Sequence, residues 1–187
     1  EGVDAYELNV SCPNTKHGGM FFSSDPRLLA EVTGAAVRAA RRPVIVKLSP
    51  NVARIDEMAR AAEESGAAAI SLVNTFLGLA IDARTRRPRL GAGYGGVSGP
   101  AIKPLALRLV REAARAVKIP VIGLGGILTG EDAAEFLISG ASAVEAGTAT
   151  MADPMAPVRI AAELDEFLRE EGVERASSLV GTLEWPP

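Results

Sequence analysis

The chain has 187 residues, of which 48% are hydrophobic and 23% charged, and its formal net charge is −3. This length can bury the core of one domain, whereas the acidic balance and the 4% of aromatic residues argue against a nucleic-acid surface. One cysteine and one histidine exclude an intrachain disulfide and a cysteine-rich metal cage, so we expect no metal site in this chain.

Short apolar runs rich in β-branched residues alternate along the chain with segments of helical period. The runs predict strands at 5–10, 43–48, 68–73, 120–124 and 143–146. Helices are predicted from Pro26 to about Arg42, from about Arg54 to Ser65, after Pro100, from Thr129 to Gly140, and from Asp153 to Gly172. Strands that alternate with helices indicate a parallel sheet with right-handed crossovers, and their apolar character indicates burial on both faces.

Polar residues or glycines follow every predicted strand at its carboxyl end. They are Asn9 and Cys12, Lys47 and Ser49, Asn74 and Thr75, Gly125 and Gly126, and Gly147 and Thr148. A (β/α)8 barrel builds its active site at this edge, although an open doubly wound sheet also binds ligands there. Because all five strands contribute, we predict an α/β fold of the TIM-barrel type, as one domain over 1–187. Five strands do not close a barrel, so we expect the C-terminal five or so βα units, with the N-terminal part missing.

One connection, 76–99, is much longer than the others. It carries Arg84, Arg86, Arg87 and Arg89 and ends in a glycine-rich segment. A loop of this length in a compact domain is usually functional, which predicts a lid or a partner surface. The simpler interpretation of the arginines is a solvated loop.

Two consecutive predicted strands near the C-terminus end in glycine, at Gly125-Gly126 and at Gly147-Thr148. In the last units of a barrel, such junctions bind phosphate through backbone N–H groups, which a Cβ atom would keep at a distance. The alternative is that the glycines only allow tight turns with positive φ. Their occurrence in adjacent units favours phosphate binding.

Lys47 stands inside the apolar strand 43–48. Its ammonium group needs an anion there, because an unpaired buried charge is costly, or else it reaches solvent at the strand end. In a phosphate-binding barrel, this lysine could stabilise negative charge on a cofactor ring.

The single cysteine, Cys12, lies between Asn9 and Asn14 in a polar loop. A thiol in such surroundings can be a general base or a nucleophile, whereas a lone cysteine elsewhere is often a small buried hydrophobe. A hydrolase with Cys12 as nucleophile would need a histidine base, and only His17 in the same loop is available. We therefore favour proton transfer at Cys12.

Taken in chain order, these features resemble the dihydroorotate dehydrogenase family. The matching segments are Asn9-Val10-Ser11-Cys12-Pro13-Asn14, Lys47, Val73-Asn74-Thr75, the run 96–104, Gly125-Gly126 and Gly147-Thr148, and they cover essentially the whole chain. Cysteine at position 12 is typical of class 1, and the segments 74–82 and 95–104 resemble the catalytic subunit of the NAD-linked, two-subunit class 1B. The resemblance implies oxidation of dihydroorotate to orotate in pyrimidine (UMP) biosynthesis.

The resemblance also implies a role for each matching position. Cys12 would be the catalytic base that removes a proton from C5 of dihydroorotate, while hydride leaves C6 for N5 of FMN. The substrate would be bound by Asn9, Asn74 and Thr75, and more weakly by Asn14. FMN would be contacted by Asn9, Lys47, Val73, Gly99, Gly125, Gly126, Gly147 and Thr148, the last four at its phosphate.

The partners implied by the resemblance are a second copy of the barrel and a separate subunit that carries FAD and a 2Fe–2S cluster. The resulting heterotetramer would pass electrons to NAD. This chain has one cysteine and cannot ligate such a cluster itself. The first strand units of the family, which also contact substrate and flavin, have no counterpart here. With no apolar run near roughly 18 residues and no signal peptide, we expect a cytoplasmic protein.

Three alternatives stay open. A related FMN barrel could act on another dihydropyrimidine or on dihydrouridine, although the acidic balance disfavours a tRNA substrate. A phosphate-binding isomerase without flavin would use the glycines but not the segment 9–14. An inactive barrel fragment would expose a sheet edge and tend to aggregate.

Overall fold

The computed structural model describes residues 2–10, 22 and 25–186. Its main sheet has five parallel strands: β1 (Tyr6–Asn9), β2 (Val44–Lys47), β3 (Ala69–Leu72), β8 (Val121–Leu124) and β9 (Ala143–Glu145). Each agrees with a predicted strand to within two residues at either end. The predicted parallel sheet is therefore confirmed.

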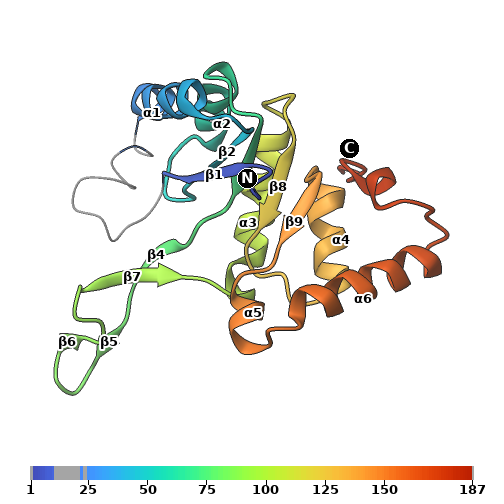
Figure 1. Cartoon of the computed structure of the whole chain (residues 1–187). Coiled ribbons are helices and arrows are strands. Elements are labelled where there is room, and N and C mark those ends of the chain that lie inside the picture. The colour runs from blue at the N-terminus through green and yellow to red at the C-terminus, as the bar shows by residue number, and fades with distance from the viewer. Residues whose placement is uncertain (1, 11–21, 23–24, 187) are drawn as a thin grey trace.

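The strands follow one another in the order β1-β2-β3-β8-β9, so each lies beside the strand that precedes it in the main sheet. A doubly wound sheet reverses its order at a switch point, and this sheet has no such reversal among the described strands. At least one helix follows each main strand before the next or before the chain ends, and α1 to α4 lie on the outer face while the sheet curves about its other face (Figure 1). These features are those of five βα units of a (β/α)8 barrel.

The helices begin and end where the sequence places caps and glycines. α1 (Pro26–Ala39) starts with proline, and the carboxylate of its N-cap Asp25 accepts a hydrogen bond from the Arg27 N–H at 2.8 Å. α4 (Gly130–Ser139) has a capping box between Thr129 and Asp132 and ends at Gly140, whose φ of 119° is left-handed. The remaining helices are α2 (Ile55–Glu64), α3 (Lys103–Ala114), α5 (Thr148–Ala152) and α6 (Ala156–Glu170), with short 3-10 turns η2 (Pro100–Ile102) and η3 (Ala176–Leu179).

The predicted helix from Asp153 to Gly172 is confirmed as α6, and the structure adds a short helix that the sequence analysis missed, α5, directly before Asp153. Asp153 and Pro154 separate the two, because Asp153 has an extended backbone and proline cannot continue a preceding helix. α5 thus begins directly after Gly147, at the carboxyl end of β9.

The two faces of the sheet bury different side chains. Val44 and Val46 of β2, with Ile70 and Leu72 of β3, are buried in the hydrophobic core. Because side chains alternate along a strand, Lys47 of β2 lies on the opposite, concave face. Register places Asn9 of β1 and Ser71 of β3 directly beside it, so polar residues line the inside of the curve.

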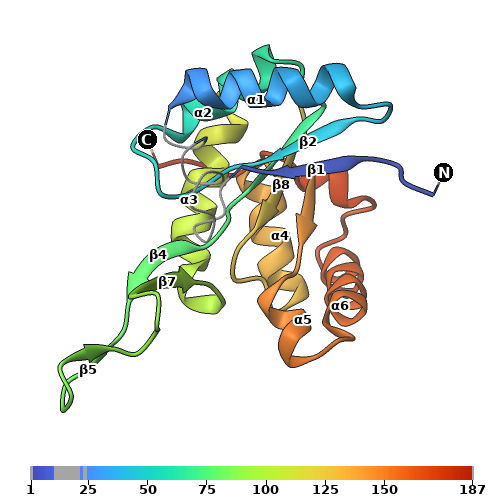
Figure 2. The same ribbon diagram turned by 60° about the vertical axis from the view of Figure 1, so that its left-hand side comes forward.

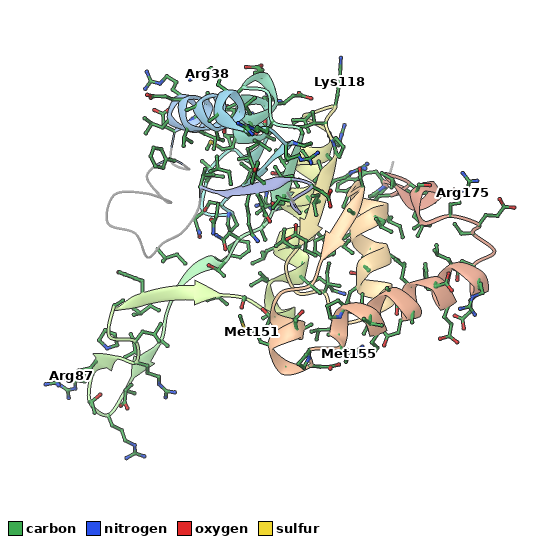
Figure 3. All side chains as sticks on the ribbon, viewed as in Figure 1. Arg38, Arg87, Lys118, Met151, Met155 and Arg175 are labelled. Carbon is green, nitrogen blue, oxygen red and sulfur yellow. The ribbon has the colours of Figure 1, made fainter. Side chains whose placement is uncertain are left out.

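The connection 76–99 is not the irregular loop that the sequence predicts. It forms the antiparallel pair β4 (Phe76–Leu79) and β7 (Tyr94–Val97), which continues into the shorter pair β5 (Ile81–Asp82) and β6 (Arg87–Pro88). This double hairpin projects away from the sheet, and Arg87 lies near its far end (Figures 2 and 3). The four arginines are exposed, as expected for solvated residues, and a lid or partner role for this segment stays a prediction.

Candidate cofactor and substrate site

A cavity of about 200 Å³ lies at the carboxyl ends of β2, β3, β8 and β9. Its lining includes most of the residues that the sequence singles out, namely Lys47, Val73, Asn74, Thr75, Gly99, Gly125, Gly126, Gly147 and Thr148. The predicted residues Cys12 and Asn14 lie outside the described residues. The tertiary structure therefore brings together side chains that are up to about a hundred residues apart in sequence.

The structure explains the glycines at Gly125-Gly126 and at Gly147-Thr148 in different ways. Gly125 and Gly126 both have positive φ, 125° and 92°. A Cβ on Gly126 would lie 2.9 Å from the carbonyl oxygen of Gly99, and one on Gly125 would lie 2.9 Å from the Ala106 Cβ. Backbone conformation and packing thus account for this pair without any ligand.

Gly147 has no such explanation. Its φ is −97°, which any residue can adopt, and a Cβ built on it meets no atom within 4 Å. Yet Gly147 lines the cavity and directly precedes α5, whose first N–H groups, like those of any helix, lack intrahelical acceptors. The open space in front of Gly147 fits an anionic group such as a phosphate, which would approach the backbone there.

Lys47 is the one ionisable side chain among the described residues that line the cavity. Its ammonium lies 3.6 Å from a carboxylate oxygen of Glu7 on β1 and 3.8 Å from one of Glu145 on β9. The side chain is only 21% exposed, so Lys47 finds its anionic partners within the protein. The predicted need for an anionic partner is thereby confirmed, while both carboxylates were missed from the sequence.

A set of amides occupies the same edge of the sheet. The Nδ2 of Asn74 donates to the Oδ1 of Asn9 at 3.4 Å, so two residues with predicted substrate contacts lie side by side. Asn51, which the sequence analysis missed, donates to the carbonyl of Thr75 at 3.0 Å and accepts from the N–H of Leu77 at 2.9 Å. These two hydrogen bonds join the loop that follows β2 to the start of β4, where the hairpin begins.

Ser98 is a second residue that sequence reasoning missed, although it belongs to the matching run 96–104. The Thr148 hydroxyl donates to the Ser98 Oγ at 3.0 Å, and both line the cavity. Met151 of α5 also lines it and is 90% exposed (Figure 3). The remaining lining residues that were not predicted are Ile102, Leu124, Ile127 and Leu128.

A salt-bridge cluster braces the β8–α4 junction beneath the cavity. Lys103 of α3 pairs with Asp132 and Glu135 of α4, and Asp132 also accepts from the N–H groups of Leu128 and Thr129. Burial raises the pKa of the Asp132 carboxyl, but these hydrogen bonds outweigh burial and hold the pKa below its usual value. The cluster fixes the backbone that continues from Gly126.

Among residues 2–10, 22 and 25–186, no group of three or more histidine, cysteine, aspartate or glutamate side chains is placed to hold a metal ion. Over the same residues, no helix is long and apolar enough to cross a membrane.

The fold is a partial (β/α)8 barrel, and its cavity at the carboxyl ends of the strands is lined by a lysine, an asparagine and several glycines. The family model for dihydroorotate dehydrogenase matches residues 1–168, and the chain belongs to this family. The predicted resemblance is thus confirmed over most of the chain.

Curated relatives include proteins named for different electron acceptors. A Solibacter usitatus protein, provisionally named dihydroorotate dehydrogenase A (fumarate), is 72% identical over 98% of this chain and 60% of its own length. A Geobacter sulfurreducens protein named dihydroorotate dehydrogenase B (NAD(+)), catalytic subunit, is 54% identical over 97% of this chain and 60% of its own length. The chain thus spans about 60% of the length of these relatives.

A solved structure shares the fold. The crystal structure of dihydroorotate dehydrogenase from Eimeria tenella in complex with ferulenol matches with a TM-score of 0.80 at 24% identity, over 96% of this chain and 54% of that one. This likeness supports the assignment of the five βα units to a barrel of this kind.

Proposed function

We propose that this chain is part of an FMN-dependent enzyme that oxidises dihydroorotate to orotate in pyrimidine biosynthesis. The observation that carries the proposal is the cavity itself, which is lined by the cation of Lys47, the amide of Asn74 and the open backbone at Gly147, and Asn74 in turn donates a hydrogen bond to Asn9. Family membership supplies the substrate class, since dihydroorotate is what the family is named for.

FMN, when bound, would accept the hydride that leaves C6 of dihydroorotate. The open space at Gly147 fits its phosphate, with Thr148, Gly125 and Gly126 completing that end of the site. Lys47 would offer a positive charge to the ring, where electron density rises during reduction. Val73 and Gly99 would line the ring and its side chain.

The substrate would lie against the amides at the strand ends. Asn9, Asn74 and Thr75 offer both donors and acceptors, as a pyrimidine ring with a carboxylate requires. Cys12 would take the proton from C5, and Asn14 would add a weaker contact; both residues lie outside the described part of the chain. Holding the ring rigidly at the cavity would align the C5 proton and the C6 hydride with their acceptors.

We further propose that electrons pass to NAD through a separate subunit, within a heterotetramer built on a dimer of the barrels. The support is the naming of several relatives as catalytic subunits of the NAD(+)-linked enzyme. FAD and a 2Fe–2S cluster would belong to the second subunit. The cytoplasmic location expected from the sequence is part of the same proposal.

The test is anaerobic mixing of the flavin-loaded protein with dihydroorotate, followed by flavin absorbance at about 450 nm. Bleaching is expected. A yellow protein that does not bleach would mean another reduced substrate, and a protein that binds no flavin would contradict the proposal. Reoxidation with NAD and with fumarate, each with and without an FAD-bearing iron–sulfur subunit, then identifies the acceptor.

A further inference from the structure

Three charged side chains from three strands meet on the concave face of the sheet. Glu7 comes from β1, Lys47 from β2 and Glu145 from β9, and the two carboxylates lie 3.6 and 3.8 Å from the one ammonium. Lys47 lines the cavity, whereas the two glutamates are not among its described lining residues. The carboxylates therefore act on a ligand through Lys47.

The two carboxylates are not equivalent. The hydroxyl of the buried Ser71 donates to Glu7 at 2.6 Å, so Glu7 is held by this hydrogen bond as well as by Lys47. Glu145 reaches Lys47 from the far side of the curve, and two strands, β3 and β8, lie between β9 and β2 in the sheet. Its position is two residues before Gly147, so it links the lysine to the strand that leads into the proposed phosphate site.

We propose that Glu145 is a positioning residue for Lys47: its carboxylate holds the ammonium at the cavity wall, and its charge sets how much positive charge Lys47 presents to the bound flavin. This inference rests on the proposed function for the identity of the ligand. The pairing of Glu145 with Lys47 itself can be tested without any ligand.

The surroundings of Glu145 make its charge sensitive to pH. Burial and the neighbouring charge of Glu7 raise the pKa of the Glu145 carboxyl, while Lys47 acts in the opposite direction. Among the residues that the structure describes, Glu7 and Lys47 are the charged groups that act on it. On the adjacent strand β8, the apolar Leu124 is its register partner.

The acidic residues nearest on α4 do not take part. Asp132 and Glu135 pair with Lys103 of α3, away from the concave face. When Glu145 is protonated, Lys47 is therefore balanced by Glu7 alone and its charge is available to a ligand.

The experiment compares Glu145→Gln with the wild type by spectroelectrochemical titration of bound FMN across a range of pH. Where wild-type Glu145 is ionised, we expect the ratio of dissociation constants for reduced and oxidised FMN to fall about tenfold in the variant, a positive shift of about 30 mV for a two-electron couple. The difference in flavin potential between the variant and the wild type should disappear as the pH falls and the wild-type Glu145 carboxyl becomes protonated. Glu112→Gln, which removes an exposed carboxylate of α3, is the matched control and should titrate like the wild type.

A second readout uses the protein without flavin. Carbon-13 NMR titration of the Glu145 carboxyl should give a higher pKa in Lys47→Met than in the wild type, because the stabilising cation is gone. An unchanged carboxyl titration, or a potential shift in Glu145→Gln that does not vary with pH, would overturn the inference. Failure of the wild type to bind FMN would instead overturn the proposed function, and the NMR titration would still decide the pairing.

Discussion

Lys47 and Glu145 form an ion pair across the inside of the curved sheet, with 3.8 Å between their charged atoms, although β3 and β8 separate their strands. Neighbouring strands lie about 4.8 Å apart, so a flat sheet would hold β2 and β9 about 14 Å apart. The contact therefore exists because the sheet bends as a barrel wall does. It also places a positive charge, balanced by carboxylates, at the floor of the cavity.

Replacement of Lys47 should destabilise the fold in a pH-dependent way. Lys47→Met leaves Glu7 and Glu145 facing each other without their cation, and we expect a loss of about 1–3 kcal/mol in the free energy of unfolding at neutral pH. The loss should shrink as pH falls, because the raised pKa of Glu145 lets it become neutral early. Urea unfolding at several pH values measures this. Lys118→Met, at an exposed lysine (Figure 3), should leave stability unchanged at every pH.

Replacement of glycine by alanine should have different effects at Gly147 and at Gly126. Gly147→Ala should fold normally, since its Cβ meets no atom, but should weaken FMN binding about tenfold or more by occupying the phosphate approach. Gly126→Ala should lower stability by about 1–3 kcal/mol, because φ is 92° and the Cβ would crowd the Gly99 carbonyl. Thermal melts and fluorescence titration with FMN separate the two effects. Unweakened FMN binding in Gly147→Ala would remove the reason for assigning that site.

Asp132 should stabilise the protein at neutral pH and lose this effect in acid. Its pKa is lower folded than unfolded, so its stabilisation is complete above the ordinary value of 3.8 and disappears as pH falls through the folded-state pKa. Asp132→Asn should cost about 1–2 kcal/mol at neutral pH through the lost cap and salt bridge. Chemical denaturation at pH values above and below the ordinary pKa checks both statements. The exposed Asp165→Asn on α6 is the control.

The proposed base predicts a kinetic effect without a binding effect. Cys12→Ser should retain FMN, because the proposed phosphate site at Gly147 is untouched, while flavin reduction by dihydroorotate becomes much slower at neutral pH. A serine hydroxyl is a far weaker base than a thiolate at that pH. Stopped-flow absorbance measures the rate. Equal reduction rates in the two proteins would rule out Cys12 as the base.

Much of the fold can be predicted because its signals are local. Apolar β-branched runs predict all five main strands, and Pro26, Thr129 and Gly140 mark helix ends through cap chemistry that involves a few neighbouring residues. The hairpin 76–97 was missed because its strands are short, contain glycine and have no fully buried residue, so they lack the apolar β-branched runs that identify the five main strands.

The sequence was sufficient to predict which residue types stand at the strand ends, and hence the family, most of the polar and glycine residues of the cavity and the need of Lys47 for an anion. Only the tertiary structure decided which anions these are, because Glu7 and Glu145 are 138 positions apart and meet through the curvature of the sheet. It also distinguished Gly147 from Gly125 and Gly126, since φ and the space around a Cβ depend on neighbours that no local pattern encodes. The residue types at the strand ends can be read from short segments of sequence. The partners of a charged side chain and the free space beside a backbone depend on how distant segments pack together.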